Sequence, residues 1–251
     1  MHTQTAIYNV FIVFRHELRA YFSSPIGYIA IGLYLLAVWL FLWVIPGSYN
    51  VFDNGYAQLD GLFALSPWLF MLLCPALTMR LIAEEKLSGT WDIILTRPVE
   101  PWQIVSGKLL AAWTVCLIAL LPNVLSYAAV SYLAQPAGNV DGGAFIGGMT
   151  GLVALVAVNS AVGLFASALT RSQIVAFIIA AALCFTLFYG FDLLCSFIGT
   201  GSILDTLTKF GFHEHYKSVS RGVLVGADIV YFLAVTLLFG WLTTLIAKRR
   251  P

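Results

Sequence analysis

The distribution of apolar residues constrains this chain more than any other feature of its sequence. Six mostly apolar stretches are each long enough to cross a bilayer core as a helix, which takes about 20 residues. They cover residues 26–46, 62–80, 108–133, 143–169, 174–198 and 228–247. Charged residues make up only 10% of the chain, too few to cover a compact soluble core. The sequence therefore predicts one all-α, six-span membrane domain over residues 1–251.

The basic residues predict an orientation. If the N-terminus is cytoplasmic, the outer side receives only Lys209, Lys217 and Arg221. Because cytoplasmic loops carry an excess of Lys and Arg, we expect a multi-pass protein with both termini in the cytoplasm. The basic residues assigned to the cytoplasmic side are Arg15, Arg19, Arg80, Lys86, Arg97, Lys108, Arg171, Lys248, Arg249 and Arg250.

Residues that carry chemistry are scarce within the spans. Asp192 and Asp228 lie near outer ends rather than at the midplane, which argues against an ion-coupled transporter. Asn159 is as well explained by hydrogen bonding between helices as by substrate contact. The net charge of +1 gives no basic surface for nucleic acid. The four cysteines lie in apolar runs, so we expect buried free thiols at Cys74, Cys116, Cys184 and Cys195.

One fragment resembles the end of a phosphate-binding loop. Gly107 and Lys108 have the right spacing, but Trp102 takes the place of the first glycine. Leu109 takes the place of the Ser or Thr that would hold magnesium. We therefore expect that the chain itself binds no ATP, holds no cofactor or metal, and is not an enzyme.

The segment over residues 81–107 is the longest predicted cytoplasmic connection and the most charged. Gly89 breaks the helix that leaves the second span, and Thr90 can cap a short helix that runs through Leu95. That helix ends at Arg97-Pro98, because the residue before a proline avoids the helical region. A simple connection needs about two to eight residues. We therefore favour a docking surface over a solvated loop.

Two further segments have an amphipathic pattern but do not qualify as membrane spans. Residues 6–22 have apolar residues at helical spacing and basic residues elsewhere on the wheel, which predicts an amphipathic interfacial helix, either a simple anchor or one with a specific role. Residues 199–227 predict two short outer helices, interfacial or re-entrant, broken near Gly211. His213 and His215 lack the four-residue spacing of a zinc-protease helix. A metal-handling protein or enzyme that uses these histidines is the less favoured alternative.

A repeated glycine spacing predicts close helix packing. Gly143, Gly147 and Gly151 are each four residues apart at the outer end of the fourth span. This spacing lets the backbone of another helix approach closely, inside one protomer or between two. It carries no prediction about catalysis.

Two passages of the sequence resemble the ABC-2 type permeases, the membrane subunits of ATP-binding-cassette transporters. Residues 14–26, FRHELRAYFSSPI, are similar to the amphipathic connecting helix of that family. Residues 84–99, EEKLSGTWDIILTRPV, are similar to its most distinctive signature, a charged helix followed by Gly-Thr, an acidic residue, a leucine, a hydroxyl residue and a proline. The passage from His215 to Val223, with Asp228 and Tyr231-Phe232 after it, resembles the gliding-motility-associated subgroup.

The resemblance implies a type V exporter-like fold in a bacterial inner membrane and ATP-dependent transport, in the direction of export, of an unknown substrate. Two separate ATPase subunits would hold Mg-ATP, and a second permease copy or a related membrane subunit would complete the complex, with a possible periplasmic or membrane accessory protein. The alternative is a membrane scaffold that drives a mechanical or assembly process outside the membrane.

The resemblance also implies that the 81–107 segment supplies the coupling helix, which seats in a cleft of the ATPase. Polar contacts would come from four charged residues, Glu84, Glu85, Asp92 and Arg97. Apolar contacts would come from Ile94 and Leu95, and Gly89 and Pro98 would set the helix ends. Thr90 and Thr96 complete the implied coupling set.

Overall fold

The computed structural model describes residues 2–53, 55–96, 99–136, 138–193, 211–220, 222 and 226–248, with side chains from residue 6 onward. Most of these residues are helical, as the sequence predicts. The helices are α1 (His2–Ser23), α2 (Pro25–Trp43), α3 (Asp60–Thr78), α4 (Arg80–Leu87), α5 (Thr90–Leu95), α6 (Pro101–Leu120), α7 (Asn123–Leu133), α8 (Gly142–Leu169), α9 (Gln173–Phe185), the π-helical turn η1 (Thr186–Gly190), α12 (Phe212–Ser220) and α13 (Gly226–Lys248).

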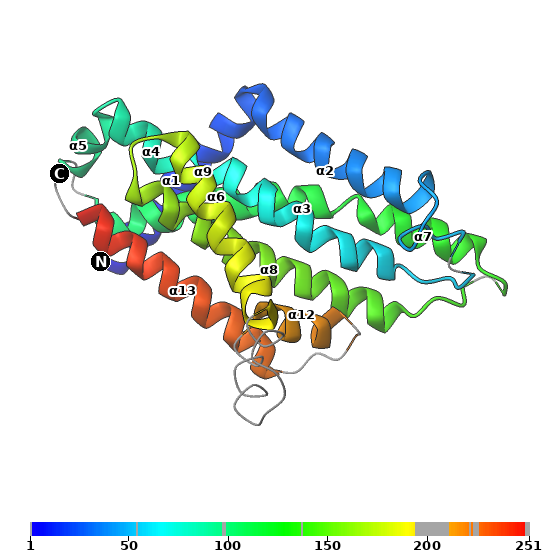
Figure 1. Ribbon diagram of the computed structural model, residues 1–251. Helices are drawn as coiled ribbons and strands as arrows, with labels where there is room; N and C mark the ends of the chain where they lie inside the picture. Colours follow the sequence, from blue (N-terminus) through cyan, green and yellow to red (C-terminus); the bar gives the residue numbers. More distant parts are fainter. Residues whose placement is uncertain are drawn as a thin grey trace.

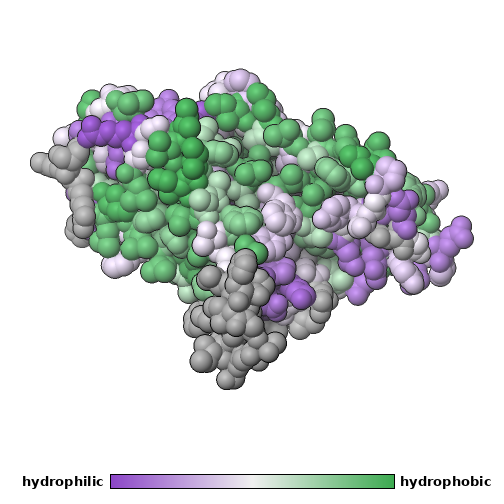
Figure 2. Space-filling view, viewed as in Figure 1, coloured by the Kyte–Doolittle hydropathy of each residue, from purple (hydrophilic) through white to green (hydrophobic). Residues whose placement is uncertain are grey.

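Within the described residues, six helical stretches are long and apolar enough to cross a membrane, as expected. Figure 2 shows an apolar surface over the middle of the bundle, with polar residues gathered towards its two ends. Such a band is expected where lipid tails replace water as the solvent. The stretches are Pro25–Trp43, Asp60–Leu87, Pro101–Leu133, Gly142–Leu169, Gln173–Leu193 and Gly226–Lys248.

Helix α8 is the central element of the bundle (Figure 1). It packs against α3, α6, α9, α12 and α13, and it is the most deeply buried of the spans. Small residues make this possible. A Cβ atom built on Gly148 would lie 2.4 Å from the ring of Phe63, and one on Gly163 would collide with Thr78. The glycines of α8 therefore leave room for side chains of α3 to lie directly against its backbone.

Two of the predicted spans are divided. The second consists of α3 and α4, which meet at Met79. The third begins at Pro101 rather than at residue 108, because proline suits the first turn of a helix, and it runs on to Leu120. Pro122 then separates α6 from α7, since proline cannot donate the hydrogen bond that would continue the helix.

Helix α1 is more than a surface anchor. It packs along α6, where a Cβ atom built on Gly107 would lie 2.7 Å from the Cβ of Val13. The hydroxyl of Tyr21 donates a hydrogen bond to the carbonyl oxygen of Leu77 at 2.7 Å. Burial raises the pKa of Tyr21, so the phenol stays a neutral donor. Helix α1, α5 and the last turn of α13 lie at the same end of the bundle (Figure 1).

Candidate functional site

The short helix α5 lies at one end of the bundle, at the left of Figure 1, and follows a sharp turn in the chain. Gly89 precedes it with φ of 72°, in the left-handed region that favours glycine. The expected helix over residues 90–95 is present. Its N-cap is Gly89 rather than Thr90, whose hydroxyl instead donates to the carbonyl oxygen of Glu85 at 3.3 Å. Arg97 and Pro98, which the sequence placed at its far end, lie outside the described residues.

The side chains of α5 divide into a buried or half-buried face and an exposed face. Trp91 is only 2% exposed and belongs to the core, and Ile94 and Leu95 pack against that core. These three residues share one face because they are three and four positions apart. Asp92 and Ile93 are exposed, Ile93 at 62%. Ile93 is therefore the most exposed apolar residue of α5, whereas Ile94 and Leu95 are half-buried, and their contact with an ATPase subunit stays a prediction.

The two glutamates before α5 also face different ways. Glu84 is exposed, as a partner contact requires. The carboxylate of Glu85 turns inward and accepts a hydrogen bond from the ammonium of Lys108 at 2.7 Å. Its second oxygen, Oε2, is buried without a hydrogen-bond partner. Of the two, Glu84 is the more exposed, and the contact of Glu85 with an ATPase subunit stays a prediction.

Lys108 lies at the centre of a buried charge cluster that sequence reasoning missed. Its Nζ atom lies 2.6 Å from Oε1 of Glu17 and 2.7 Å from Oε1 of Glu85, and the lysine side chain is 2% exposed. The cluster joins α1, α4 and α6. A buried charge is tolerated only when it is paired and hydrogen-bonded. The three residues are far apart in the sequence, where Lys108 resembles an ordinary cytoplasmic lysine.

A serine of α8 supplies hydrogen-bond partners to backbone groups at the break between α3 and α4. The hydroxyl of Ser167 accepts hydrogen bonds from the backbone N–H groups of Ile82 and Ala83, at 3.1 and 3.0 Å. It donates to the carbonyl oxygen of Met79 at 2.9 Å. Backbone groups freed at a helix break must find partners when they are buried. Ser167 therefore fixes α4, which leads into α5, against the central helix.

A groove of about 530 Å³ separates α5 from the turn between α8 and α9. Lys86 and Arg171 both line it, and Ile246 of α13 contributes to its wall. The ammonium of Lys86 donates to the carbonyl oxygen of Ala168 at 2.5 Å, one of the carbonyls left free at the end of α8.

At the opposite end of the bundle, α12 is clamped between two spans. His213 Nδ1 lies 2.5 Å from Oδ2 of Asp192, and His215 Nδ1 lies 2.7 Å from Oδ1 of Asp228. The helix therefore directs the two histidines to different carboxylates. No group of three potential metal ligands was found among the described residues. Of the outer segment predicted over residues 199–227, the part before Gly211 lies outside the described residues.

The packing of α12 reflects a proline in α3. Pro67 cannot donate to the carbonyl oxygen of Phe63, four residues earlier, and the hydroxyl of Tyr216 donates to that oxygen at 2.7 Å instead. On α8, Cβ atoms built on Gly147 and Gly151 would meet the end of α12 and the residues just after it, whereas Gly143 would meet only its neighbour Asp141. The glycine spacing thus serves packing within the protomer at two of its three positions.

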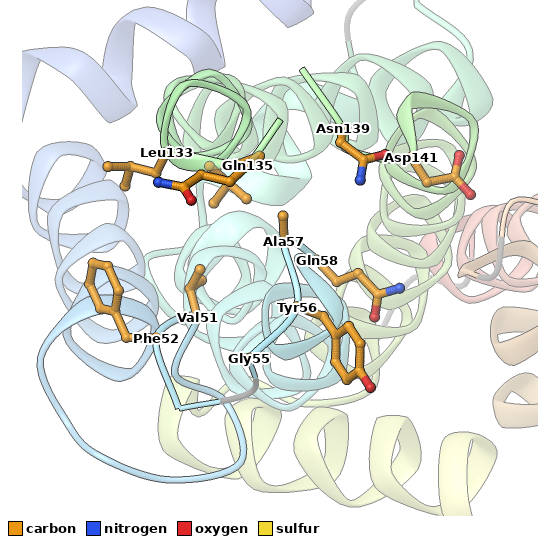
Figure 3. A pocket seen from close by; sticks show the side chains of 12 residues that line it. Val51, Phe52, Gly55, Tyr56, Ala57, Gln58, Leu133, Gln135, Asn139 and Asp141 are labelled. Atoms are coloured by element: carbon orange, nitrogen blue, oxygen red, sulfur yellow. The ribbon is translucent and has the colours of Figure 1, made fainter. Parts of the chain in front are cut away.

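A cavity of about 650 Å³ lies between connections of the spans (Figure 3). Residues 51, 52 and 55–58, from the connection between α2 and α3, form one side, and residues from the end of α7 and the loop before α8 form the other. Gln58, Gln135, Asn139 and Asp141 contribute polar groups. The connections that supply these side chains lie at the end of the bundle farthest from α5 (Figure 1), where Figure 2 shows a polar surface.

The six apolar helices define the chain as a multi-pass membrane protein. Residues 68–248 match the family model described as ABC-2 family transporter protein. The chain therefore belongs to the ABC-2 transporter family and is a membrane component of an ABC transporter. A search of curated proteins gave no match. The matched range begins within α3 and includes α5 and the groove beside it.

Proposed function

We propose that the chain is the permease subunit of an ATP-driven transporter and that α5 is the helix on which an ATPase subunit docks. The observation that carries this proposal is the construction of α5. Trp91 anchors the inner face of α5 in the core. Asp92 and Ile93 are exposed on its outer face. An exposed apolar residue next to charged residues, on a short helix that is anchored in the core, is typical of a small docking site.

The buried cluster around Lys108 would connect such a docking site mechanically to the membrane spans. A force on α5 passes through the adjoining α4, and Glu85 of α4 is held by Lys108 of α6. The same lysine holds Glu17 of α1. Closure of the ATPase subunits around ATP would then move α1, α4 and α6 together rather than bend a loop. Movement as a unit is what converts ATP binding into a rearrangement of spans.

In this proposal the α5 end faces the cytoplasm of a bacterium, and both termini lie on that side of the inner membrane. Two copies of the chain, or one copy with a related subunit, pair with two ATPase subunits that hold Mg-ATP, and the complex exports its substrate. The chain is in this proposal a relative of the gliding-motility-associated permeases, and what supports this part is the resemblance of the passage from His215 to Val223.

The test is purification of the tagged chain from its native membrane in mild detergent, with every co-purifying subunit identified. We expect a stoichiometric ATPase subunit. Asp92→Arg and Ile93→Asp should each weaken its retention about 30-fold, the effect of losing about 2 kcal/mol at a binding hot spot. In membranes, Asp92→Arg should also uncouple ATP hydrolysis from transport while the spans stay folded.

The control is Glu214→Arg, which reverses an exposed charge on α12 at the opposite end and should leave the ATPase bound. A chain that emerges alone, without a nucleotide-hydrolysing subunit, contradicts the proposal. So does full activity of the Asp92→Arg complex, because the docking site would then lie elsewhere.

A further inference from the structure

The groove between α5 and the α8–α9 turn carries positive charge that the described residues do not neutralise. Lys86 bonds a backbone carbonyl, and no acidic side chain within the described residues forms an ion pair with Lys86 or Arg171. Asp92 is the acid of the lining, and it forms no ion pair with either cation. Two cations that line one groove repel each other, and an anion bound between them would relieve this repulsion.

A second observation points to an acceptor as the missing group. Trp91 lines the groove, and its indole Nε1 is buried with no hydrogen-bond partner in the described part of the chain. Buried polar groups nearly always have a partner, and an unpaired indole N–H calls for an acceptor. Lys86, Arg171 and Trp91 are all donors, so the wall of the groove suits a group that only accepts, such as a phosphate.

The groove also opens onto an apolar surface. Leu87, at its rim, is 66% exposed, and Ile246 belongs to its wall. From Ile246, α13 continues with exposed Leu245 and Trp241, at 40% and 58%. An aromatic ring at such a position is typical of the boundary between headgroups and acyl chains. A phosphate in the groove would therefore have a lipid-exposed helix beside it.

We propose that this groove binds the headgroup of an anionic phospholipid, with the phosphate between Lys86 and Arg171 and an acyl chain along α13. Basic pockets between spans suit acidic headgroups because each Lys or Arg adds attraction to an anionic lipid. The proposal rests on the proposed function only for the leaflet, which is the cytoplasmic one. Since Trp91 and Asp92 belong to α5, the bound lipid holds the proposed docking helix in place.

The test measures lipid binding to the purified chain without any ATPase, by native mass spectrometry in a neutral detergent. Phosphatidylglycerol and phosphatidylcholine with the same acyl chains are compared, and glycerol phosphate serves as a soluble source of the same group. We expect phosphatidylglycerol to bind at least about tenfold more tightly than either of the other two, as two basic contacts imply.

Variants locate the site. Arg171→Gln should weaken phosphatidylglycerol about fivefold, and Lys86→Gln with Arg171→Gln about 30-fold. Arg19→Gln removes an exposed positive charge of α1 outside the groove and should change the affinity less than twofold. Asp92→Asn removes the repelling carboxylate and should tighten binding. Arg171 lies in an exposed turn, so its single variant remains informative if the double variant fails to fold.

Equal binding of phosphatidylglycerol and phosphatidylcholine overturns the proposal, and so does an Arg171→Gln variant that binds like the wild type. Glycerol phosphate binding as tightly as the lipid would also overturn it, since the ligand would then be a soluble phosphate. Because no ATPase is present, these outcomes are independent of whether α5 docks one.

Discussion

Replacing Lys108 with methionine removes the buried cation that faces Glu17 and Glu85, while it keeps a chain of similar length and shape. The two carboxylates then remain close together without the ammonium that lay 2.6 and 2.7 Å from them. Their side chains are 13% and 22% exposed, so water compensates only part of the loss. We expect this variant to be the most destabilising single change proposed for the chain.

The magnitude follows from the burial. Removing one partner of a buried pair costs about 3–5 kcal/mol. The loss is bounded, because an unpaired carboxylate can take a proton, and protonating an ordinary glutamate at pH 7 costs about 4 kcal/mol. The partial exposure of both glutamates favours the lower part of the range. We therefore expect Lys108→Met to lower the free energy of unfolding by about 3–4 kcal/mol.

The assay is thermal unfolding of the purified chain in detergent, followed by tryptophan fluorescence. For a chain of this size the loss corresponds to a decrease in Tm of about 10 °C. The control is Lys217→Met, which removes an exposed lysine 3.8 Å from Glu214 and should cost less than about 1 kcal/mol. The triple variant, with Glu17→Met and Glu85→Met added, should recover to within about 1 kcal/mol of wild type, since apolar residues replace a buried ionic cluster at little cost.

Two results would refute this reasoning. A Lys108→Met variant as stable as the wild type would mean that the lysine is not buried between the carboxylates. A triple variant no more stable than the single one would mean that the lost stability came from the shape of the lysine side chain and not from unpaired charge.

Two further predictions concern packing within the bundle. Gly147→Ala would place a Cβ atom 2.6 Å from the Cα of Gly222, and because backbone cannot swing aside it should cost about 1–3 kcal/mol in the same fluorescence melt. Gly143→Ala would place a Cβ atom 3.2 Å from Oδ1 of the exposed Asp141, a side chain that can shift, and should cost less than about 0.5 kcal/mol. Tyr34→Phe removes a buried hydroxyl that bonds partners on α3 and α7, and should cost about 1 kcal/mol and speed amide hydrogen exchange at the start of α7. Tyr28→Phe, on an exposed side chain of the same helix, should leave both unchanged.

The candidate docking helix was partly predictable. Gly89 is a strong local signal, so the helix over residues 90–95 followed from the sequence. The outward face did not. A six-residue helix has too few positions for its periodicity to say which face is buried, and it was the anchoring of Trp91 in the core that turned Ile93 outward.

The six spans are what the sequence by itself determined, because a bilayer needs about 20 consecutive apolar residues per crossing and no tertiary contact can remove that requirement. Tertiary structure alone decided which polar groups meet. Lys108 resembles a loop charge until α1 and α4 fold against it, and the bond from Tyr216 to Phe63 exists because a proline in α3 leaves a carbonyl oxygen free beside α12. Local patterns determine where helices lie, whereas buried polar groups are paired between helices that the sequence keeps far apart.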